Sequence, residues 1–338
     1  MRLSESLRKN VMRSGGGGII NRFKILSRRN VLFFEDMLAG YIKACEDAGH
    51  GPRMREVAKE WGFLYVNFLP EFMESLPKSV LLNSVISKVL VNIGLLDDLK
   101  ADVAKGKVTL SIRSEAITRC IGRNVFCAGL WEGVIAGLFG RDSHVISAVQ
   151  AREKSVYSFS LGSAPFRIGS KGKSQYLDMN RIAEEPGELK RYLKMRIIVL
   201  KGNRMYFRGK SVVLGENTLF HLLGRKNILM ARVAEISCSC FRDVVDPDSS
   251  TDSKMVMLKN MLRVFGWGEI RIRYGRGRIA VEIAGPPCGI QKGPDDWSFF
   301  ANAILGYLFL VDSRYRISGI RKSGRLLELS YSVGSVKD

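Results

Sequence analysis

The chain has 338 residues, of which 46% are hydrophobic and 25% charged, and its 53 Lys and Arg outnumber 33 Asp and Glu to give a net charge of +20. This composition is typical of a folded globular protein; it excludes disorder for most of the chain and, with only six Cys, a disulfide-built mini-protein. No apolar run reaches the roughly 18 residues of a membrane-spanning helix and no signal peptide is visible, so we expect a cytoplasmic protein of about two domains.

The N-terminal segment is basic and contains a run of glycines. Glu5 is the single acidic residue among the first 29, and Gly15–Gly18 is typical of a flexible joint. We therefore predict a flexible basic arm over residues 1–30, with folded structure beginning near Val31.

The first half of the chain reads as helices followed by strands. Apolar residues at helical spacing predict helices, and alternation predicts strands. The predicted helices span 32–48, 53–68, 78–93 and 124–139, and the predicted strands span 107–113, 145–152 and 155–161.

The second half repeats this order after a polar stretch at 162–188. Short strands are expected within 195–214, and the hairpins pair 266–274 with 278–283 and 315–321 with 326–333. The predicted helices span 216–223, 228–240, 253–265 and 296–310.

The two halves can be laid over each other. Gly133–Phe139 matches Asn302–Leu308 with Gly137 on Gly306, residues 145–152 match 314–321, and residues 157–161 match 327–331. The sequence thus predicts an α+β protein with two diverged copies of a domain, each with helices packed on an antiparallel sheet. The predicted boundaries are 31–162 for the first copy, 163–194 for a linker and 195–338 for the second copy, and the two copies are candidates for a pseudo-dimer.

Several residues carry a resemblance to a known family. In the first half they are a helix that ends in Gly94 ahead of a strand, the glycine-spaced helix Cys127–Gly137 and a closing hairpin that ends in Tyr157–Phe159. In the second half they are Phe265–Gly268 and Trp297–Tyr307. Each half resembles the 4-vinyl-reductase-like, or hydrocarbon-binding, domain, whose fold is shared with small TRAPP subunits and haem nitric-oxide sensor domains. The resemblance implies an antiparallel sheet under helices and a small apolar or lipid-like ligand.

The resemblance does not supply a metal or haem. Some family members place Cys ligands near the closing hairpin, but this sequence has no Cys between Cys127 and Cys238, and no His falls on a haem motif. We therefore predict no cofactor other than an apolar ligand.

The pocket candidates are apolar and aromatic residues of the two central helices. A filled core is the alternative interpretation of the same residues. They are Phe126, Leu130, Trp131 and Val134 in the first half, and Trp297, Phe300 and Tyr307 in the second.

Clustered positive charge points to a polyanionic partner such as nucleic acid, or to an anionic membrane surface. The alternative interpretation is a solvated face with cross-strand Arg–Glu pairs. Alternation places one group of arginines on the outer face of the second sheet, and that face lacks outward aromatics for base stacking. The candidates are Arg191, Lys194, Arg196, Lys201, Arg204, Arg271, Arg273, Arg278, Arg314 and Arg316.

No catalytic signature emerges. Cys238 and Cys240 read as a buried thiol pair, His50, His144 and His221 are far apart in sequence, and the glycine runs lack the ending of a P-loop. Asp295 or Asp296 is expected to cap the helix that follows.

The favoured function is thus a non-enzymatic binding protein that holds a small apolar ligand or serves as an assembly platform. The alternative is a nucleic-acid or ribonucleoprotein binder, and a third, weaker idea is an enzyme of unknown type.

Overall fold

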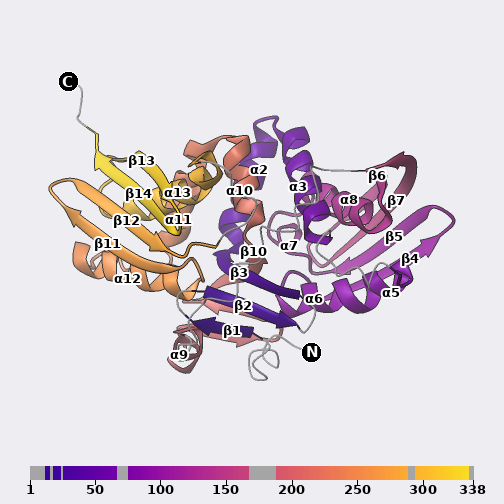
Figure 1. Ribbon diagram of the computed structural model, residues 1–338, viewed down its shortest axis with the longest axis horizontal. Coiled ribbons are helices and arrows are strands. Elements are labelled where there is room, and N and C mark those ends of the chain that lie inside the picture. Colours follow the sequence, from indigo (N-terminus) through magenta and orange to yellow (C-terminus); the bar gives the residue numbers. More distant parts are fainter. Residues whose placement is uncertain are drawn as a thin grey trace.

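The computed structural model describes residues 12–15, 18–23, 26–66, 75–166, 188–287 and 294–334, and it confirms the α+β class. The described strands form one six-stranded and two four-stranded sheets. Each four-stranded sheet belongs to one lobe, and the six-stranded sheet lies at the base of both lobes (Figure 1).

Two three-stranded meanders, joined by pairing of β3 with β10, form the six-stranded sheet. In the pairing, Leu32 lies opposite Leu214 and Phe34 opposite Val212. The strands are β1 (Met12–Gly15), β2 (Gly18–Phe23), β3 (Leu26–Phe34), β8 (Ile198–Lys201), β9 (Arg204–Phe207) and β10 (Lys210–Glu216).

The first meander differs from the flexible arm predicted over residues 1–30. Strands β1, β2 and the start of β3 occupy much of that segment, while residues 1–11 lie outside the described part of the chain. Gly15 and Gly18, which look like part of a linker in the sequence, are a cross-strand pair of β1 and β2. Basic and polar residues hide the alternation that would have revealed these strands.

The first lobe follows β3. Asn124 caps α8 by accepting a hydrogen bond from the Cys127 backbone N–H at 2.8 Å, and Gly140 ends the helix in the left-handed region. The sheet order is β4-β5-β7-β6. The elements are α2 (Glu35–Asp47), α3 (Gly51–Val66), the continuous helical run α5 (Lys78–Val80), η1 (Leu81–Ile86) and α6 (Ser87–Asn92), then β4 (Asp98–Ala104), β5 (Lys107–Arg113), α7 (Thr118–Ile121), α8 (Val125–Phe139), β6 (Arg141–Gln150) and β7 (Lys154–Pro165).

The second lobe follows β10 with the same kind of succession. Its sheet order, β11-β12-β14-β13, matches that of the first lobe position by position. The elements are α10 (Thr218–Lys226), α11 (Met230–Arg242), α12 (Thr251–Val264), β11 (Glu269–Gly275), β12 (Arg278–Ala284), η3 (Pro294–Trp297), α13 (Ser298–Leu308), β13 (Tyr315–Ser323) and β14 (Leu326–Val333); α9 (Glu188–Lys194) precedes β8.

Helices fill the space between the two four-stranded sheets, so each sheet has one covered and one open face (Figure 1). The predicted alternation is confirmed: the inward side chains of β5 and β12 are buried and their neighbours are not. These inward side chains are Val108, Leu110 and Ile112 in the first lobe and Ile279, Val281 and Ile283 in the second.

The lobes are tied together reciprocally. The Leu32 backbone N–H of β3 donates to the Phe265 carbonyl of the second lobe at 2.8 Å, and the Leu214 N–H of β10 donates to the Ile93 carbonyl of the first lobe at 3.4 Å. Helix α2 packs on α11 of the opposite lobe, and α10 packs on α3. Each lobe therefore uses the other lobe's strand and first helix.

Close helix contacts correct the sequence overlay. A Cβ on Gly133 would lie 1.9 Å from the Lys59 carbonyl oxygen of α3, and one on Gly306 would lie 2.3 Å from the Ala234 carbonyl oxygen of α11. Gly133, and not Gly137, thus takes the place of Gly306.

In the closing hairpins, too, the structure pairs a residue of the first half with a later residue of the second half than the sequence overlay does. Phe159 faces Val108 and Tyr331 faces Ile279, which pairs Phe159 with Tyr331 as equivalents. Glycines one helical turn apart make such a slip invisible in the sequence. Common ancestry of the two lobes stays a prediction.

None of the described helices combines the length and the apolar character needed to cross a bilayer.

Candidate functional site

A cavity of about 40 Å³ lies in the first lobe beneath α2, α3 and α8. By volume it has room for about three water-sized groups. Its walls are mostly apolar, with two carboxylates among them. The lining residues are Phe33, Glu35, Leu38, Trp61, Leu90, Leu95, Leu96, Glu115, Ala116, Ile117, Cys127, Leu130, Trp131 and Val213.

Glu115 lies in a short connection between β5 and α7 whose backbone is unusual. Ser114 and Ile117, on either side of it, have φ values of 52° and 69°. Positive φ is rare for a β-branched residue such as Ile and has to be held by the surroundings. Backbone bonds from Ser114 to Glu153 (2.7 Å) and from Ala116 to Leu95 (2.7 Å) hold it.

The Glu115 carboxylate is buried and receives three hydrogen bonds. Trp131 Nε1 donates to Oε1 at 2.5 Å, while Tyr157 Oη and Thr118 Oγ1 donate to Oε2 at 2.6 and 2.9 Å. Burial raises the pKa of Glu115, and these donors oppose the rise by stabilising the ionised form. The carboxyl group is therefore fixed in position at one end of the cavity.

Cys127 and Trp61 are two further buried residues with a polar group among those that line the cavity. Burial and the neighbouring Glu115 raise the pKa of the Cys127 thiol, and its Sγ donates weakly to the Ala116 carbonyl at 3.6 Å. Trp61 is 4% exposed, and its indole N–H has no hydrogen-bond partner among the described residues. A buried donor without a partner is unfavourable, so Trp61 is suited to a hydrogen-bond acceptor.

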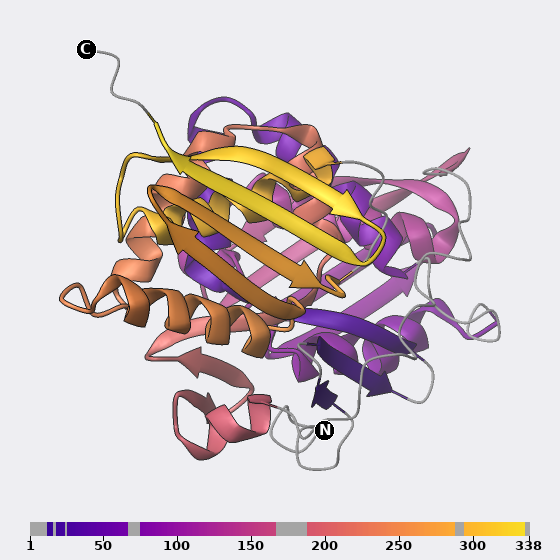
Figure 2. The same ribbon diagram turned by 60° about the vertical axis from the view of Figure 1, so that its left-hand side comes forward.

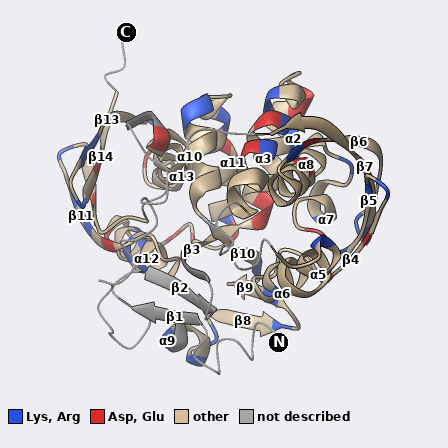
Figure 3. Cartoon of the chain, turned by 45° about the vertical axis from the view of Figure 1, so that its right-hand side comes forward, with Lys and Arg blue, Asp and Glu red and all other residues tan. Residues whose placement is uncertain are grey.

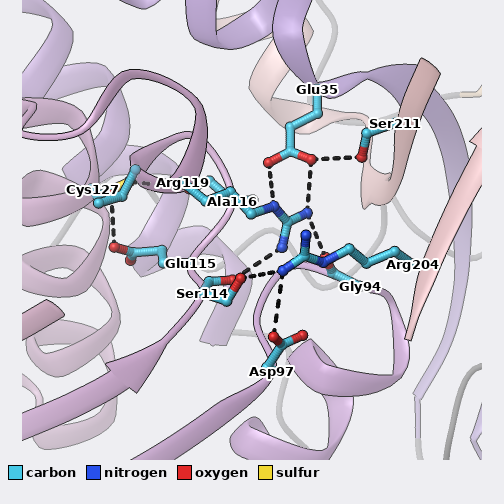
Figure 4. Close-up of polar contacts among 11 residues, drawn as sticks. Glu35, Gly94, Asp97, Ser114, Glu115, Ala116, Arg119, Cys127, Arg204 and Ser211 are labelled. Atoms are coloured by element: carbon cyan, nitrogen blue, oxygen red, sulfur yellow. Dashed lines mark hydrogen bonds and ion pairs between the residues drawn. The ribbon is translucent and has the colours of Figure 1, made fainter. Parts of the chain in front are cut away.

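The second buried carboxylate is that of Glu35, at the start of α2, and it forms an ion pair with Arg119 (Figure 4). Arg119 donates to both of its oxygens, at 2.6 and 2.8 Å, and Ser211 of β10 donates at 2.8 Å. Arg119 also donates to the backbone carbonyls of Ser114 and Gly94. These hydrogen bonds link the connection between β5 and α7, which carries Glu115, to strand β10, which pairs with β3.

Arg204 of β9 extends the network. It donates to Ser114 Oγ and lies 3.4 Å from the Asp97 carboxylate. Arg204 thus links the six-stranded sheet to the first lobe as a half-buried residue, although it is one of the predicted polyanion-binding candidates.

The second lobe has a cavity of similar size, about 40 Å³, in a different setting. None of its described lining residues has a charged side chain. The residues are Leu32, Phe33, Phe34, Met37, Phe220, Phe241, Leu258, Met261, Leu262, Phe265, Trp267, Phe299, Phe300, Ala303 and Ile304. Phe33 lines both cavities, so β3 runs between them.

Three of the seven predicted pocket residues line a cavity: Leu130, Trp131 and Phe300. Of the other four, which are packed in the core, Phe126 lies beside Trp61, Val134 is buried in α8, Trp297 contacts His221 edge-on, and Tyr307 donates to the Lys254 carbonyl.

The predicted polyanion candidates divide into three groups. Arg271, Arg273, Arg278 and Arg316 are exposed on the open face of the second sheet, and Arg314 pairs with Asp312 beside it at 2.8 Å. The exposed residues Arg191, Lys194, Arg196 and Lys201 lie on α9, in the turn after it and on β8, away from that sheet. Arg204 differs from both groups because it is half-buried and bonded to Ser114 and Asp97.

Three further predictions concern the second lobe: the Cys238 and Cys240 pair, the cap at Asp296, and His221. Cys238 and Cys240 are buried on α11 as expected, and being two residues apart they face different directions; Cys240 Sγ donates to Asp36 at 3.1 Å. Asp296 does not cap the next helix: Trp297 is its N-cap residue, and the Asp296 carboxylate accepts from Arg225 at 2.8 Å. His221 is buried between Asn217 and the Asp296 carbonyl.

Four residues of this site were not predicted from the sequence: Glu35, Trp61, Glu115 and Arg119. A carboxylate shortly after a strand is common on protein surfaces, and the sequence contains no motif that marks Glu115 as buried. Comparison of the chain with protein-family models, with curated proteins and with solved structures found no match.

Proposed function

We propose that this chain is a non-enzymatic binding protein whose first lobe holds a small, mainly apolar molecule. The supporting observation is the first-lobe cavity, which combines apolar walls, a Trp61 whose N–H has no partner among the described residues, and a fixed Glu115 carboxyl group. Ligand sites in proteins commonly combine apolar walls with a few placed polar groups.

The dimensions limit the ligand. A cavity of about 40 Å³ accepts a molecule of about three or four heavy atoms, or the end of a longer chain entering past the half-buried Leu130. An oxygen acceptor on the ligand would satisfy the Trp61 N–H. The proposal thus favours a short alcohol, ketone or similar group over a bulky lipid.

The protonation of Cys127 and the hydrogen bonds of Glu115 favour binding over catalysis. The raised thiol pKa keeps Cys127 protonated at neutral pH, and a thiol is a poor nucleophile compared with a thiolate. The oxygens of Glu115 are occupied by Trp131, Tyr157 and Thr118. The resemblance to the hydrocarbon-binding family, carried by residues such as Cys127–Gly137, agrees with this reading.

The test uses a homologous series of short alcohols as probes. Trp61 and Trp131 line the cavity, so their fluorescence reports occupancy. We expect affinity to rise by up to about 0.8 kcal/mol per methylene until the cavity is filled, then to stop rising. Mass spectrometry of the denatured pure protein would identify any natural ligand.

Matched variants locate the binding. Ala116→Leu fills the first-lobe cavity and Ala303→Leu fills the second-lobe cavity. We expect the first change to abolish the fluorescence response and the second to leave it intact. A response that survives Ala116→Leu, or no response in the parent protein, would refute the proposal.

A further inference from the structure

The open face of the second four-stranded sheet carries arginines from three of its strands, β11, β12 and β13. No described helix or loop covers this face (Figure 2). Arg271 and Arg273 lie on β11, Arg278 on β12, and Arg316 and Arg321 on β13, all exposed. Arg276 lies in the turn between β11 and β12.

Strand register divides this face into two ends with different charge. In one row, Arg271 faces Glu282, Glu282 faces Glu328, and Glu328 faces Arg321. Glu282 also pairs with Arg273. Two carboxylates between the arginines make this end close to balanced.

The other end has no such compensation. There Arg278 faces Ser332, and Ser332 faces Arg316. Within the described residues, neither Arg276, Arg278 nor Arg316 forms an ion pair with a carboxylate. We call Arg276, Arg278 and Arg316 the arginine end of the sheet.

The arginine end is held in place. Arg278 and Arg316 are separated by one strand, so their Cα atoms lie about 10 Å apart on a hydrogen-bonded sheet. Arg316 Nη1 donates to the Ser313 and Tyr315 carbonyls at 2.8 and 2.7 Å, which fixes its guanidinium group. The other nitrogens of that group are left for an external acceptor.

We propose that the arginine end binds the phosphate backbone of a nucleic-acid duplex without reading its sequence. Arginine forms bidentate bonds with phosphate, and a chain of net charge +20 is drawn to a polyanion. Among the described residues of this sheet, Leu326 is a large exposed apolar side chain, but it lies at the opposite end. Tyr274 lies next to the arginine end, but it alternates with the outward Arg273, and its hydroxyl donates to Asp252 of α12 at 2.8 Å. The open face at the arginine end therefore offers, within the described residues, neither a stacking platform for single strands nor an apolar wedge for a bilayer.

The first sheet provides a matched control. Lys105 and Lys107 take the places of Arg276 and Arg278 at the equivalent turn, and Lys100 lies on the neighbouring strand β4. Asp98 and Asp102 share that strand, and Figure 3 shows both signs of charge on the first sheet. Reversing three lysines there changes the net charge as much as reversing the three arginines.

The experiment measures binding of a short RNA duplex to the full chain over a range of salt concentrations. We expect Arg276→Glu, Arg278→Glu and Arg316→Glu together to weaken binding on the order of 10- to 100-fold and to reduce the salt slope by roughly 3, since each phosphate contact contributes about 0.9. Lys100→Glu, Lys105→Glu and Lys107→Glu together should weaken binding only a few-fold. Circular dichroism establishes that both variants fold, and a triple change to Gln replaces either one that does not.

Three results would overturn the proposal. They are no binding of the duplex by the parent protein, equal weakening by the two triple variants, and loss of binding to phosphatidylserine vesicles, but not to the duplex, in the arginine variant. None of these results bears on the alcohol titration, so this proposal and the cavity proposal fail separately.

Discussion

The two lobes share one order of strands but differ in the side chains that line their cavities and in the charge on the open faces of their sheets. The first lobe buries Glu35 and Glu115 beside its cavity, whereas the second lines its cavity with apolar groups, including Trp267 stacked on Phe300 at 4.0 Å. The open face of the second sheet has an arginine end without carboxylate partners among the described residues, whereas the open face of the first sheet carries both signs of charge. One architecture thus supports an interior polar site in one place and an exterior basic surface in another.

Breaking the buried ion pair of the first lobe is expected to have the largest effect on the free energy of unfolding. Arg119→Leu leaves Glu35 without its cation in the core, and we expect a loss of about 3–5 kcal/mol in the free energy of unfolding, measured by urea denaturation. The double variant Glu35→Leu and Arg119→Leu removes both charges and should recover much of that loss. Equal losses in the single and double variants would show that the pair does not act as a unit.

Close helix packing predicts the next largest effect in both lobes. Gly133→Ala and Gly306→Ala each force a Cβ against a carbonyl oxygen, so each should lower the free energy of unfolding by about 3 kcal/mol. Gly319→Ala is the control, because its nearest neighbour would be 3.8 Å away. Tolerance of Gly306→Ala but not Gly133→Ala would mean that the helix pairs of the two lobes are not equivalent.

Because its pKa is lowered, His221 of the second lobe is expected to make the stability of the protein depend on pH. Burial lowers the pKa of His221 from 6.5 to about 4, so between these values the unfolded chain binds the proton more readily than the folded one. Stability from this group is present above about pH 6.5 and is lost as the pH falls toward 4, by about 2–3 kcal/mol. In His221→Gln, thermal denaturation should show a flatter acid limb; an unchanged limb would contradict the assignment.

Glu115 predicts a dependence of opposite sign in the first lobe. Burial raises its pKa, so its contribution is greatest below the ordinary carboxyl pKa and falls as the pH rises through the raised value. We expect a smaller effect than for His221 because three donors favour the ionised form. The measurement is the stability of the parent chain minus that of Glu115→Gln across the acid range, and a difference that grows with pH would refute the prediction.

The smallest effect is expected at the surface of the second sheet. Arg273 pairs with Glu282 but is 69% exposed, so Arg273→Ala should change the free energy of unfolding by less than about 1 kcal/mol. The measurement is urea denaturation at low and high salt. A larger loss would mean that the pair organises the sheet and is not merely part of a solvated face.

Strong local signals made part of this fold predictable. Strand β5 coincides with the predicted 107–113, and Asn124 before the apolar run of α8 marked that helix start. Strand β4 was missed because Asp98–Ala104 alternates weakly, with Leu99 its only fully buried residue. Local alternation also gave the outward arginines of the second sheet.

The first-lobe site was beyond reach of the sequence for a different reason. Burial of Glu115 depends on Trp131 and Tyr157, which come from a later helix and strand, and on two residues with positive φ around it. Such contacts are set by tertiary packing, and no periodicity records them. The one-turn slip between Gly133 and Gly137 has the same origin, because only the facing helix distinguishes the two glycines.

The pairing of β3 with β10 has a consequence for how the molecule can be divided. Cutting the chain between Pro165 and Glu188 would separate two fragments that each leave a strand without its neighbour and a hydrogen bond, Leu32 to Phe265 or Leu214 to Ile93, without its acceptor. Neither fragment alone would be a finished folding unit. Fragment complementation, dependent on the concentration of both pieces, is the behaviour this interleaving implies.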